Sequence, residues 1–503
     1  MTALPFLLAA VLAAPAAETL PEGVTREEVV WMGTLPRRPL PNEDIVVTTP
    51  EGGPPRLSLR ARTSRPEPLH PLPLGTNLLT QARAVSFGVD GRCAVSLASG
   101  QLVLECTPGA SVAGAVLRFE GARLPQGGRL VLQTAASGSD NFRAELVPAG
   151  ADARAPRPLD EPLPLPAIAG PAQLTVLAPW QGGKLVLNNL RIAPAAAFAP
   201  TSNASAWAWS PSLWRQDPQA LIASARARGV NRLFVSLEVE DGKVANQRSL
   251  RRFLEAASDA GLAVEAVEGD PRMVLPAGRA AAVERARAIA AYQREASPAA
   301  RLAGIQYDVE PYTLAEWGET GAATYAGWAE TMLALAEATG EPIHLVLPFW
   351  IPNEEAGRAM LERIAPVVRE VTVMSYRTDP ALLSQIAEPL LAWGAANGKP
   401  VRLGLEAERL RDEKEQLFTT AAEGNLAVGA GEAPQVLLLD GSRAVPGAAM
   451  YRGQRTVDIP AQRLSFLGDE VRMAALARET AHLFAAWPNF AGFAFHGLEW
   501  PEK

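Results

Sequence analysis

The sequence is poor in lysine, cysteine and histidine, and these shortages narrow the possible functions. Five of its 503 residues are Lys, two are Cys and four are His, and the formal net charge is −7. Neither a basic nor an acidic block interrupts the chain, so a nucleic-acid partner, which would require a basic face, is not expected. A neutral polymer such as a glycan is compatible with this charge. The abundance of Arg, Ala, Gly and Pro is typical of GC-rich bacterial coding.

The two cysteines do not indicate a metal or redox centre. Cys93 and Cys106 lie in neighbouring strand-like runs that are separated by a turn at Gly100, and this spacing matches no known ligand set. In an exported protein they could form a disulfide, and two packed thiols are the alternative. Gly-rich phosphate loops, a G-x-S-x-G elbow and an H-E-x-x-H motif are also missing. We therefore expect no cofactor and no metal.

The chain has no apolar run long enough to span a bilayer, so no transmembrane segment is expected. A shorter apolar run, residues 4–12, precedes the small residues 14–16. This pattern resembles a secretory signal peptide, although no Lys or Arg comes before the run. The sequence thus predicts a signal peptide over residues 1–17 and a periplasmic or extracellular location. The alternative is a frayed apolar N-terminus or a misplaced start.

A chain of this length is expected to form two or three domains. Residues 18–75 are rich in Pro, Arg and Glu, which indicates an extended arm or a small appended segment. In residues 76–198, about seven short strand-like runs alternate with turns rich in Gly, Pro, Asn and Asp. This spacing is typical of a β-sandwich. Within it, Trp180 is either a sugar-stacking residue or a rim aromatic.

Residues 199–503 alternate strand-like and amphipathic helical runs, which predicts a (β/α)8 TIM barrel. An excess of residues near 411–466 suggests a lid or a small insertion. The eight expected strands are residues 206–209, 232–237, 263–267, 304–309, 344–348, 370–375, 401–405 and 491–496.

The strand ends carry acidic and aromatic residues. In such a barrel the carboxyl ends of the strands converge on one site. Asp308 and Glu310 close the fourth strand and, being two residues apart, point to the same side. Carboxylates can perform acid/base chemistry, and aromatic faces stack on sugar rings. The other candidates at the strand ends are Trp207, Trp209, Glu268, Asp270, Trp350, Tyr376, Arg377, Glu406 and His496.

Three short motifs resemble the chitinase-like glycoside hydrolase family 18. Residues 304–310, Gly-Ile-Gln-Tyr-Asp-Val-Glu, are similar to the fourth-strand motif G-x-D-x-D-x-E of that family, and residues 373–376, Val-Met-Ser-Tyr, to its sixth-strand M-x-Y. Residues 399–405 are similar to its seventh-strand run. The resemblance implies that Glu310 is the acid, that Asp308 assists the acetamide of the substrate, and that Tyr376 steadies that group.

Two departures and one alternative accompany this resemblance. Gln306 stands where the family has Asp, and Arg377 stands where an Asp commonly follows the Tyr. The chain is also similar to retaining barrel glycosidases, in which Glu406 would attack while Glu310 protonates the leaving oxygen. Their carboxyl groups would then lie about 5–5.5 Å apart, whereas about 6.5–9.5 Å would indicate inversion.

The sequence therefore predicts an exported glycoside hydrolase that cleaves a polysaccharide or a cell-wall glycan, with a carbohydrate polymer or oligosaccharide as its partner. A glycan-binding protein with a degenerate barrel is the main alternative, and an envelope scaffold is another. Each candidate also has a structural alternative. The tryptophans could pack in a core, Glu310 could pair with an arginine, and Asp270 before Pro271 could cap a helix.

Overall fold

The computed structural model describes residues 20–62, 68–138, 140–146, 155–166, 170–314 and 317–501. The predicted signal peptide, residues 1–17, lies outside the described residues. Among the helices in the described ranges, none combines the length and the hydropathy needed to cross a membrane.

Eight parallel strands close into a barrel, as the alternation of strands and helices predicted. Their order around the barrel follows the sequence, and the last strand pairs with both the first and the seventh. The fourth strand is short, so the chain leaves the sheet just before Asp308. The strands are β15 (Ala204–Ala208), β16 (Arg232–Ser236), β19 (Ala263–Glu268), β20 (Ile305–Tyr307), β21 (Ile343–Pro348), β22 (Val368–Met374), β23 (Val401–Glu406) and β28 (Phe490–His496).

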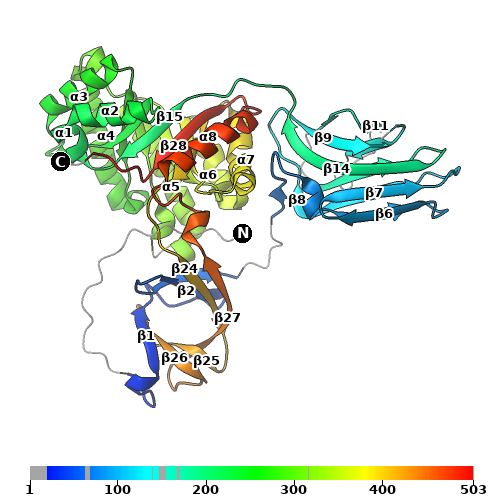
Figure 1. Ribbon diagram of the computed structural model, residues 1–503. Helices are drawn as coiled ribbons and strands as arrows, with labels where there is room; N and C mark the ends of the chain where they lie inside the picture. The colour runs from blue at the N-terminus through cyan, green and yellow to red at the C-terminus, as the bar shows by residue number, and fades with distance from the viewer. Residues whose placement is uncertain are drawn as a thin grey trace.

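Helices surround the barrel (Figure 1) and cover the apolar outer faces of its strands. They are α1 (Pro211–Gln216), α2 (Pro218–Ala227), α3 (Gln247–Asp259), α4 (Pro276–Glu295), α5 (Trp317–Thr339), α6 (Glu355–Ile364), α7 (Pro380–Asn397) and α8 (Glu470–Phe484). A small hairpin, β17 (Val239–Glu240) with β18 (Lys243–Val244), follows β16. Short 3-10 turns are η1 (Arg26–Glu28), η2 (Leu78–Gln81), η3 (Pro271–Val274), η4 (Pro298–Ala300), η5 (Pro311–Thr313), η6 (Ile351–Asn353) and η7 (Ala461–Arg463).

The expected arm and the expected insertion pair with each other in one seven-stranded antiparallel sheet. The early strands β1 (Val29–Thr34), β2 (Glu43–Pro50) and β3 (Arg56–Ala61) join the late strands β24 (Glu413–Thr420), β25 (Gly424–Val428), β26 (Gln435–Arg443) and β27 (Ala449–Ile459). Their order is β1-β26-β25-β27-β24-β2-β3. An apolar cluster that includes Ile45 and Phe418 fills this sheet from both parts of the chain. Neither part is therefore a free-standing appendage.

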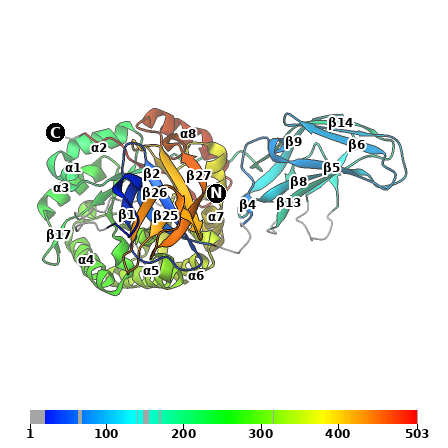
Figure 2. The same ribbon diagram turned by 90° about the horizontal axis from the view of Figure 1, so that it is seen from below.

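This seven-stranded sheet lies over one end of the barrel. It stands below the barrel in Figure 1 and in front of it in Figure 2. The chain enters it directly from the C-terminal end of β23 and returns through η7. There, the Thr378 backbone N–H and side-chain hydroxyl donate to the carbonyls of Arg463 and Gln462. The covered end is therefore the one where the carboxyl ends of the strands meet.

Two further, mostly antiparallel sheets precede the barrel and lie to one side of it (Figure 1). One contains β4 (His70–Pro71), β5 (Arg83–Phe87), β8 (Gly114–Arg123), β10 (Arg143–Leu146), β11 (Arg157–Pro158) and β13 (Pro171–Leu177). The other contains β6 (Cys93–Ala98), β7 (Gln101–Cys106), β9 (Leu130–Ser137), β12 (Leu163–Pro164) and β14 (Gly183–Pro194). A disulfide joins Cys93 to Cys106 across β6 and β7. Of the two alternatives, a disulfide or two packed thiols, the structure has the disulfide. Trp180, between β13 and β14, is 57% exposed.

The barrel contacts these sheets through a buried ion pair. The Arg123 guanidinium, at the end of β8, donates to both carboxylate oxygens of Glu388 on α7 at 2.8 and 2.5 Å. The Gln126 backbone N–H also donates to Glu388. Because the Glu388 side chain is 1% exposed, its charge depends on these donors.

Candidate active site

Asp308 and Glu310 stand directly after β20, at the covered end of the barrel. The Asp308 backbone N–H still donates to the Glu268 carbonyl at 2.8 Å, which holds this segment beside β19. Pro311 then begins η5 and turns the chain away from the sheet. A strand of three residues followed by this turn therefore places two carboxylates at the mouth of the barrel.

Asp308 is partly buried, and one of its carboxylate oxygens has no partner among the residues that the structure describes. Its Oδ1 atom is shielded from solvent and accepts no hydrogen bond from that part of the chain. Burial and the nearby Glu310 charge together raise the pKa of Asp308 to about 8, while His496 opposes the change. An uncompensated carboxylate in such a place favours its protonated form. This unsatisfied group is the strongest mark of function at the mouth, because native proteins rarely leave a buried polar atom unpaired.

Glu310 is held by a neighbour that the sequence interpretation did not single out. The Tyr312 hydroxyl donates to Oε1 of Glu310 at 2.6 Å and also contacts the Met374 sulfur at 3.8 Å. Burial raises the pKa of Glu310, while the Tyr312 hydrogen bond lowers it. No arginine pairs with Glu310 in the part of the chain that the structure describes. Tyr312 lies two residues after Glu310 on the same segment, and this spacing was the one sequence feature that could have predicted the contact.

Tyr376 follows β22 and lies at the same mouth. It is buried, and its ring packs against Gly404 on β23, where an added Cβ would lie 3.1 Å from the ring. Burial raises the pKa of its hydroxyl, and the charges of Glu406, Asp308 and Glu310 raise it further. A phenol that stays protonated next to two carboxyl groups can donate a hydrogen bond to a ligand oxygen.

Glu406, His496 and Trp209 form a hydrogen-bonded chain across three adjacent strand ends. The His496 Nδ1–H donates to Oε2 of Glu406 at 2.7 Å, and the Trp209 indole N–H donates to Nε2 of His496 at 2.9 Å. The other Glu406 oxygen accepts the Glu408 backbone N–H at 2.7 Å. Glu406 is 1% exposed, so both of its oxygens are used inside the protein.

Donor atoms of Glu406, Glu408 and His496 lie within 4.8 Å of one another, a spacing that could hold a cation. The hydrogen bonds just described already use both Glu406 oxygens and both His496 nitrogens. Binding a cation would break them, so we assign no metal to these side chains.

Trp207 lies deeper and is not available as a sugar platform. It is 2% exposed and packs inside the barrel with Phe234. Its indole N–H donates to the Gln306 side-chain carbonyl at 2.7 Å, and the Gln306 amide contacts Nε2 of His344 at 3.2 Å. The core-packing alternative holds for Trp207. Gln306, where family 18 has Asp, acts as a neutral bridge between an indole and an imidazole.

Below Gln306, the base of the barrel is filled by a buried ionic network. His344 donates through Nδ1 to Glu265, which also pairs with Arg369 at 2.7 Å. Glu370 pairs with Arg232 and Arg402 at 2.9 and 2.8 Å. Burial opposes the charge on both carboxyl groups, but His344 and, after it, the arginines hold the pKa of both below the usual range. The sequence did not predict this network, because its members lie on different strands that are distant in the sequence.

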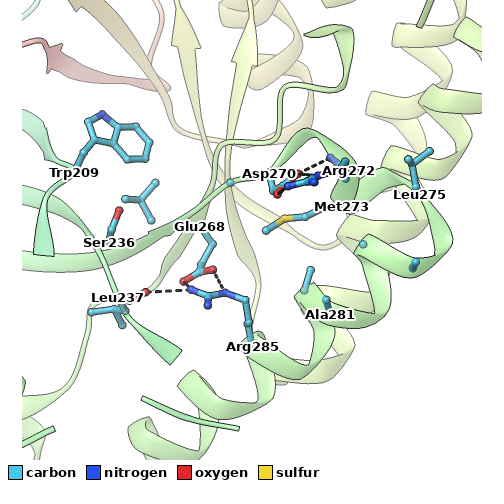
Figure 3. A pocket seen from close by; sticks show the side chains of 15 residues that line it. Trp209, Ser236, Leu237, Glu268, Asp270, Arg272, Met273, Leu275, Ala281 and Arg285 are labelled. Atoms are coloured by element: carbon cyan, nitrogen blue, oxygen red, sulfur yellow. Dashed lines mark hydrogen bonds and ion pairs between the residues drawn. The ribbon is translucent and has the colours of Figure 1, made fainter. Parts of the chain in front are cut away.

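Beside the mouth lies a pocket of about 700 Å³ (Figure 3). It opens between the ends of β16 and β19 and the start of α4, and Trp209 forms part of its wall. Asp308, Glu310 and Tyr376 do not line it, although Gly269 in its wall lies so near Asp308 that an added Cβ would clash with the Asp308 carbonyl. The pocket therefore adjoins the carboxylate pair without containing it.

Two carboxylates of this pocket that were predicted to bind substrate form ion pairs with arginines. Arg285 from α4 donates to both oxygens of Glu268 at 2.7 and 2.8 Å (Figure 3). Asp270 caps η3 through the Arg272 backbone N–H at 2.8 Å, and it also pairs with the Arg272 side chain. The capping alternative thus holds for Asp270. A sugar hydroxyl could donate to either group only at acceptor positions that the arginines leave unused.

Two other predicted binding residues are also engaged. Trp350 is half-buried and meets Tyr312 and Trp317 edge to face, with ring centroids 5.5 and 6.0 Å apart. Arg377 is buried and donates to the Tyr376 carbonyl at 2.7 Å. Its guanidinium lies 5.1 Å from the Phe349 ring. Trp350 thus packs against Tyr312, and Arg377 is hydrogen-bonded to the backbone of Tyr376, so both residues contact side chains or backbone at the barrel mouth.

No protein-family model and no curated protein matches the sequence. Solved structures match part of the chain. One is the spore cortex-lytic enzyme SleL from Bacillus cereus, at 12% identity over 62% of this chain and 74% of that chain, with a TM-score of 0.30. Another is a family 18 chitinase from Cycas revoluta bound to (GlcNAc)3, at 12% identity over 59% and 94%, with a TM-score of 0.30.

A chitinase from Bacteroides thetaiotaomicron matches at 10% identity over 58% of this chain and 88% of that chain, with a TM-score of 0.32. The barrel fold that the sequence predicted is shown by the closed ring of eight parallel strands, independently of these matches. The chemistry of the mouth has to be derived from its own side chains.

Proposed function

We propose that the protein is a glycoside hydrolase in which Glu310 is the general acid. The observation that carries this proposal is the Asp308–Glu310 pair at the barrel mouth, with an unpaired buried oxygen on Asp308 and raised pKa values on both groups. A carboxyl group that keeps its proton near neutral pH can protonate a leaving oxygen.

We propose further that the attacking group comes from the substrate. Glu406, the alternative nucleophile, is 1% exposed and uses both oxygens to hold His496 and the Glu408 backbone. A sugar with a 2-acetamido group carries its own nucleophile, the acetamide oxygen, as in the substrate-assisted mechanism of family 18. The proposed substrate is therefore a polysaccharide or cell-wall glycan that contains N-acetylated sugars.

In this mechanism Glu310 gives its proton to the glycosidic oxygen while the C1–O bond breaks. The acetamide oxygen forms a new bond to C1, and Asp308 accepts a hydrogen bond from the acetamide N–H. Tyr376 donates a hydrogen bond to the acetamide oxygen. Glu310, now ionised, takes a proton from water, which opens the cyclic intermediate and restores the enzyme.

The test is a panel of polysaccharides with and without N-acetyl groups, assayed for new reducing ends. We expect activity on N-acetylated glycans and a loss of about 10²-fold or more in Glu310→Gln. Glu105→Gln is the matched control, because Glu105 is exposed and pairs with Lys184 on a distant sheet. Glycan binding without turnover, unaffected by Glu310→Gln, would instead support a non-catalytic glycan-binding protein.

We also propose that the protein is exported and that the two mostly antiparallel sheets form a β-sandwich before the barrel. The N-terminal pattern of residues 1–17 and the Cys93–Cys106 disulfide support export, because disulfides persist in oxidising compartments. Cell fractionation tests this point. A cytosolic protein with reduced cysteines would contradict it.

A further inference from the structure

The hydrogen bond between Trp209 and His496 connects the pocket to the carboxylate pair. Trp209 follows β15, is 40% exposed and lines the 700 Å³ pocket. Its indole N–H reaches Nε2 of His496 at 2.9 Å. Trp209 thus touches the pocket with its ring and the barrel mouth with its nitrogen.

This bond sets the protonation state of His496. An indole nitrogen can donate but cannot accept a hydrogen bond, so Nε2 of His496 must present a lone pair to it. Nδ1 carries the single ring proton and donates it to Glu406 at 2.7 Å. A second proton can bind to His496 only after Trp209 has moved away.

The surroundings of His496 favour that second proton. Glu406 and Glu408 face it from the end of β23, and Asp308 faces it from the end of β20. Tyr376, after β22, lies with its ring centroid 6.0 Å away. The carboxylates raise the pKa of His496, and burial opposes them. The Trp209 bond therefore disfavours a second proton that the other neighbours of His496 favour.

A charge on His496 would in turn act on the catalytic pair. His496 is a group whose charge lowers the pKa of both Asp308 and Glu310. Asp308 accepts an acetamide N–H more strongly when it is ionised, because a charged acceptor forms a stronger hydrogen bond. The protonation of His496 is thus linked to the ionisation of Asp308, which assists the reaction.

We propose that Trp209 and His496 are positioning residues that couple the filling of the pocket to ionisation of Asp308. A sugar unit that stacks on the Trp209 ring draws the indole away, and a proton from solvent binds to Nε2 of His496. The resulting imidazolium, still held by Glu406, stabilises the Asp308 carboxylate. The identity of the ligand rests on the proposed function, whereas the link between Trp209 and His496 rests on the geometry alone.

The test is a proton NMR titration of the histidine C2–H signals. The chain has four histidines, and the signal of His496 is the one that disappears in His496→Asn. Trp209→Phe keeps an aromatic ring but removes the indole donor, so we expect the pKa of His496 to rise by about 0.5 to 1. Trp180→Phe, on a remote exposed loop, is the matched control and should leave it unchanged.

The second arm adds an N-acetylglucosamine tetramer to the Glu310→Gln variant, which is not expected to cleave it. The tetramer should raise the pKa of His496 in the same direction as Trp209→Phe. An unchanged His496 titration in Trp209→Phe would overturn the coupling, whereas an unchanged titration with the tetramer, beside a shifted one in Trp209→Phe, would overturn the assignment of the ligand. The Trp209→Phe titration needs no substrate, so the coupling and the proposed hydrolysis can fail separately.

Discussion

Replacing Asp308 with asparagine should make the protein more stable at alkaline pH while removing its activity. In the folded protein Asp308 keeps its proton up to a pKa of about 8, against an ordinary value of 3.8. Between these values the folded state binds one proton more than the unfolded state, so the free energy of unfolding falls as pH rises. Asparagine has nearly the same shape and cannot ionise, so this loss disappears.

The size of the effect follows from the difference between the two pKa values. A separation of about 4 pH units corresponds to an upper limit of about 6 kcal/mol. Asp308 titrates together with Glu310, so only part of this limit belongs to Asp308, and we expect an effect on the order of 2 kcal/mol. At pH 4 the two proteins should be nearly equal in stability, and at pH 8.5 the variant should exceed the wild type.

Urea denaturation of both proteins at several pH values measures this difference. Asp458→Asn is the matched control, since Asp458 is 78% exposed and pairs only loosely with Lys414 at 3.8 Å. A stability difference between Asp308→Asn and the wild type that does not change with pH would refute the reasoning. An equal pH dependence in Asp458→Asn would also refute it.

Two further predictions concern Glu310 and the contact between the sheets and the barrel. Tyr312→Phe removes the hydrogen bond that lowers the pKa of Glu310, so the alkaline limb of the pH–rate profile should move to higher pH; an unchanged limb would contradict this role. Arg123→Ala leaves the Glu388 carboxylate buried without its ion-pair partner and should cost about 3 kcal/mol or more of unfolding free energy. Arg83→Ala, in an exposed pair, should cost less than about 1 kcal/mol in the same urea titration, and equal losses would contradict the importance of burial.

Local pattern was sufficient to predict the barrel. Each of the eight expected strands overlaps an observed one, because buried parallel strands read as short apolar runs between amphipathic helices. The same frame located Asp308, Glu310, Tyr376, Glu406 and His496 at strand ends. It could do so because convergence of those ends follows from the topology and needs no knowledge of side-chain contacts.

The pairing of distant segments could not be predicted in this way. β2 and β24 are adjacent strands, with Ile45 opposite Phe418, yet several hundred residues separate them in the sequence. Their alternating pattern shows that each needs a partner strand but does not identify it. This is why the expected arm and the expected insertion were described as separate pieces.

Side-chain partners were hidden for a similar reason. Glu268 and Asp270 look like free carboxylates at a strand end, and only the folded chain brings Arg285 against Glu268. Trp207 and Trp209 are two residues apart, yet one is 2% and the other 40% exposed. Because the strand ends between them, the depth of each ring depends on where the barrel closes.

The most direct test of Glu310 as the general acid compares two leaving groups. A dinitrophenyl glycoside of the cleaved sugar releases a phenolate that needs no protonation, whereas the natural glycan releases an alcohol that does. We predict that Glu310→Gln loses about 10²-fold or more in rate on the glycan, but far less in release of dinitrophenolate. An equal loss on both substrates would contradict the assignment of Glu310 as the acid.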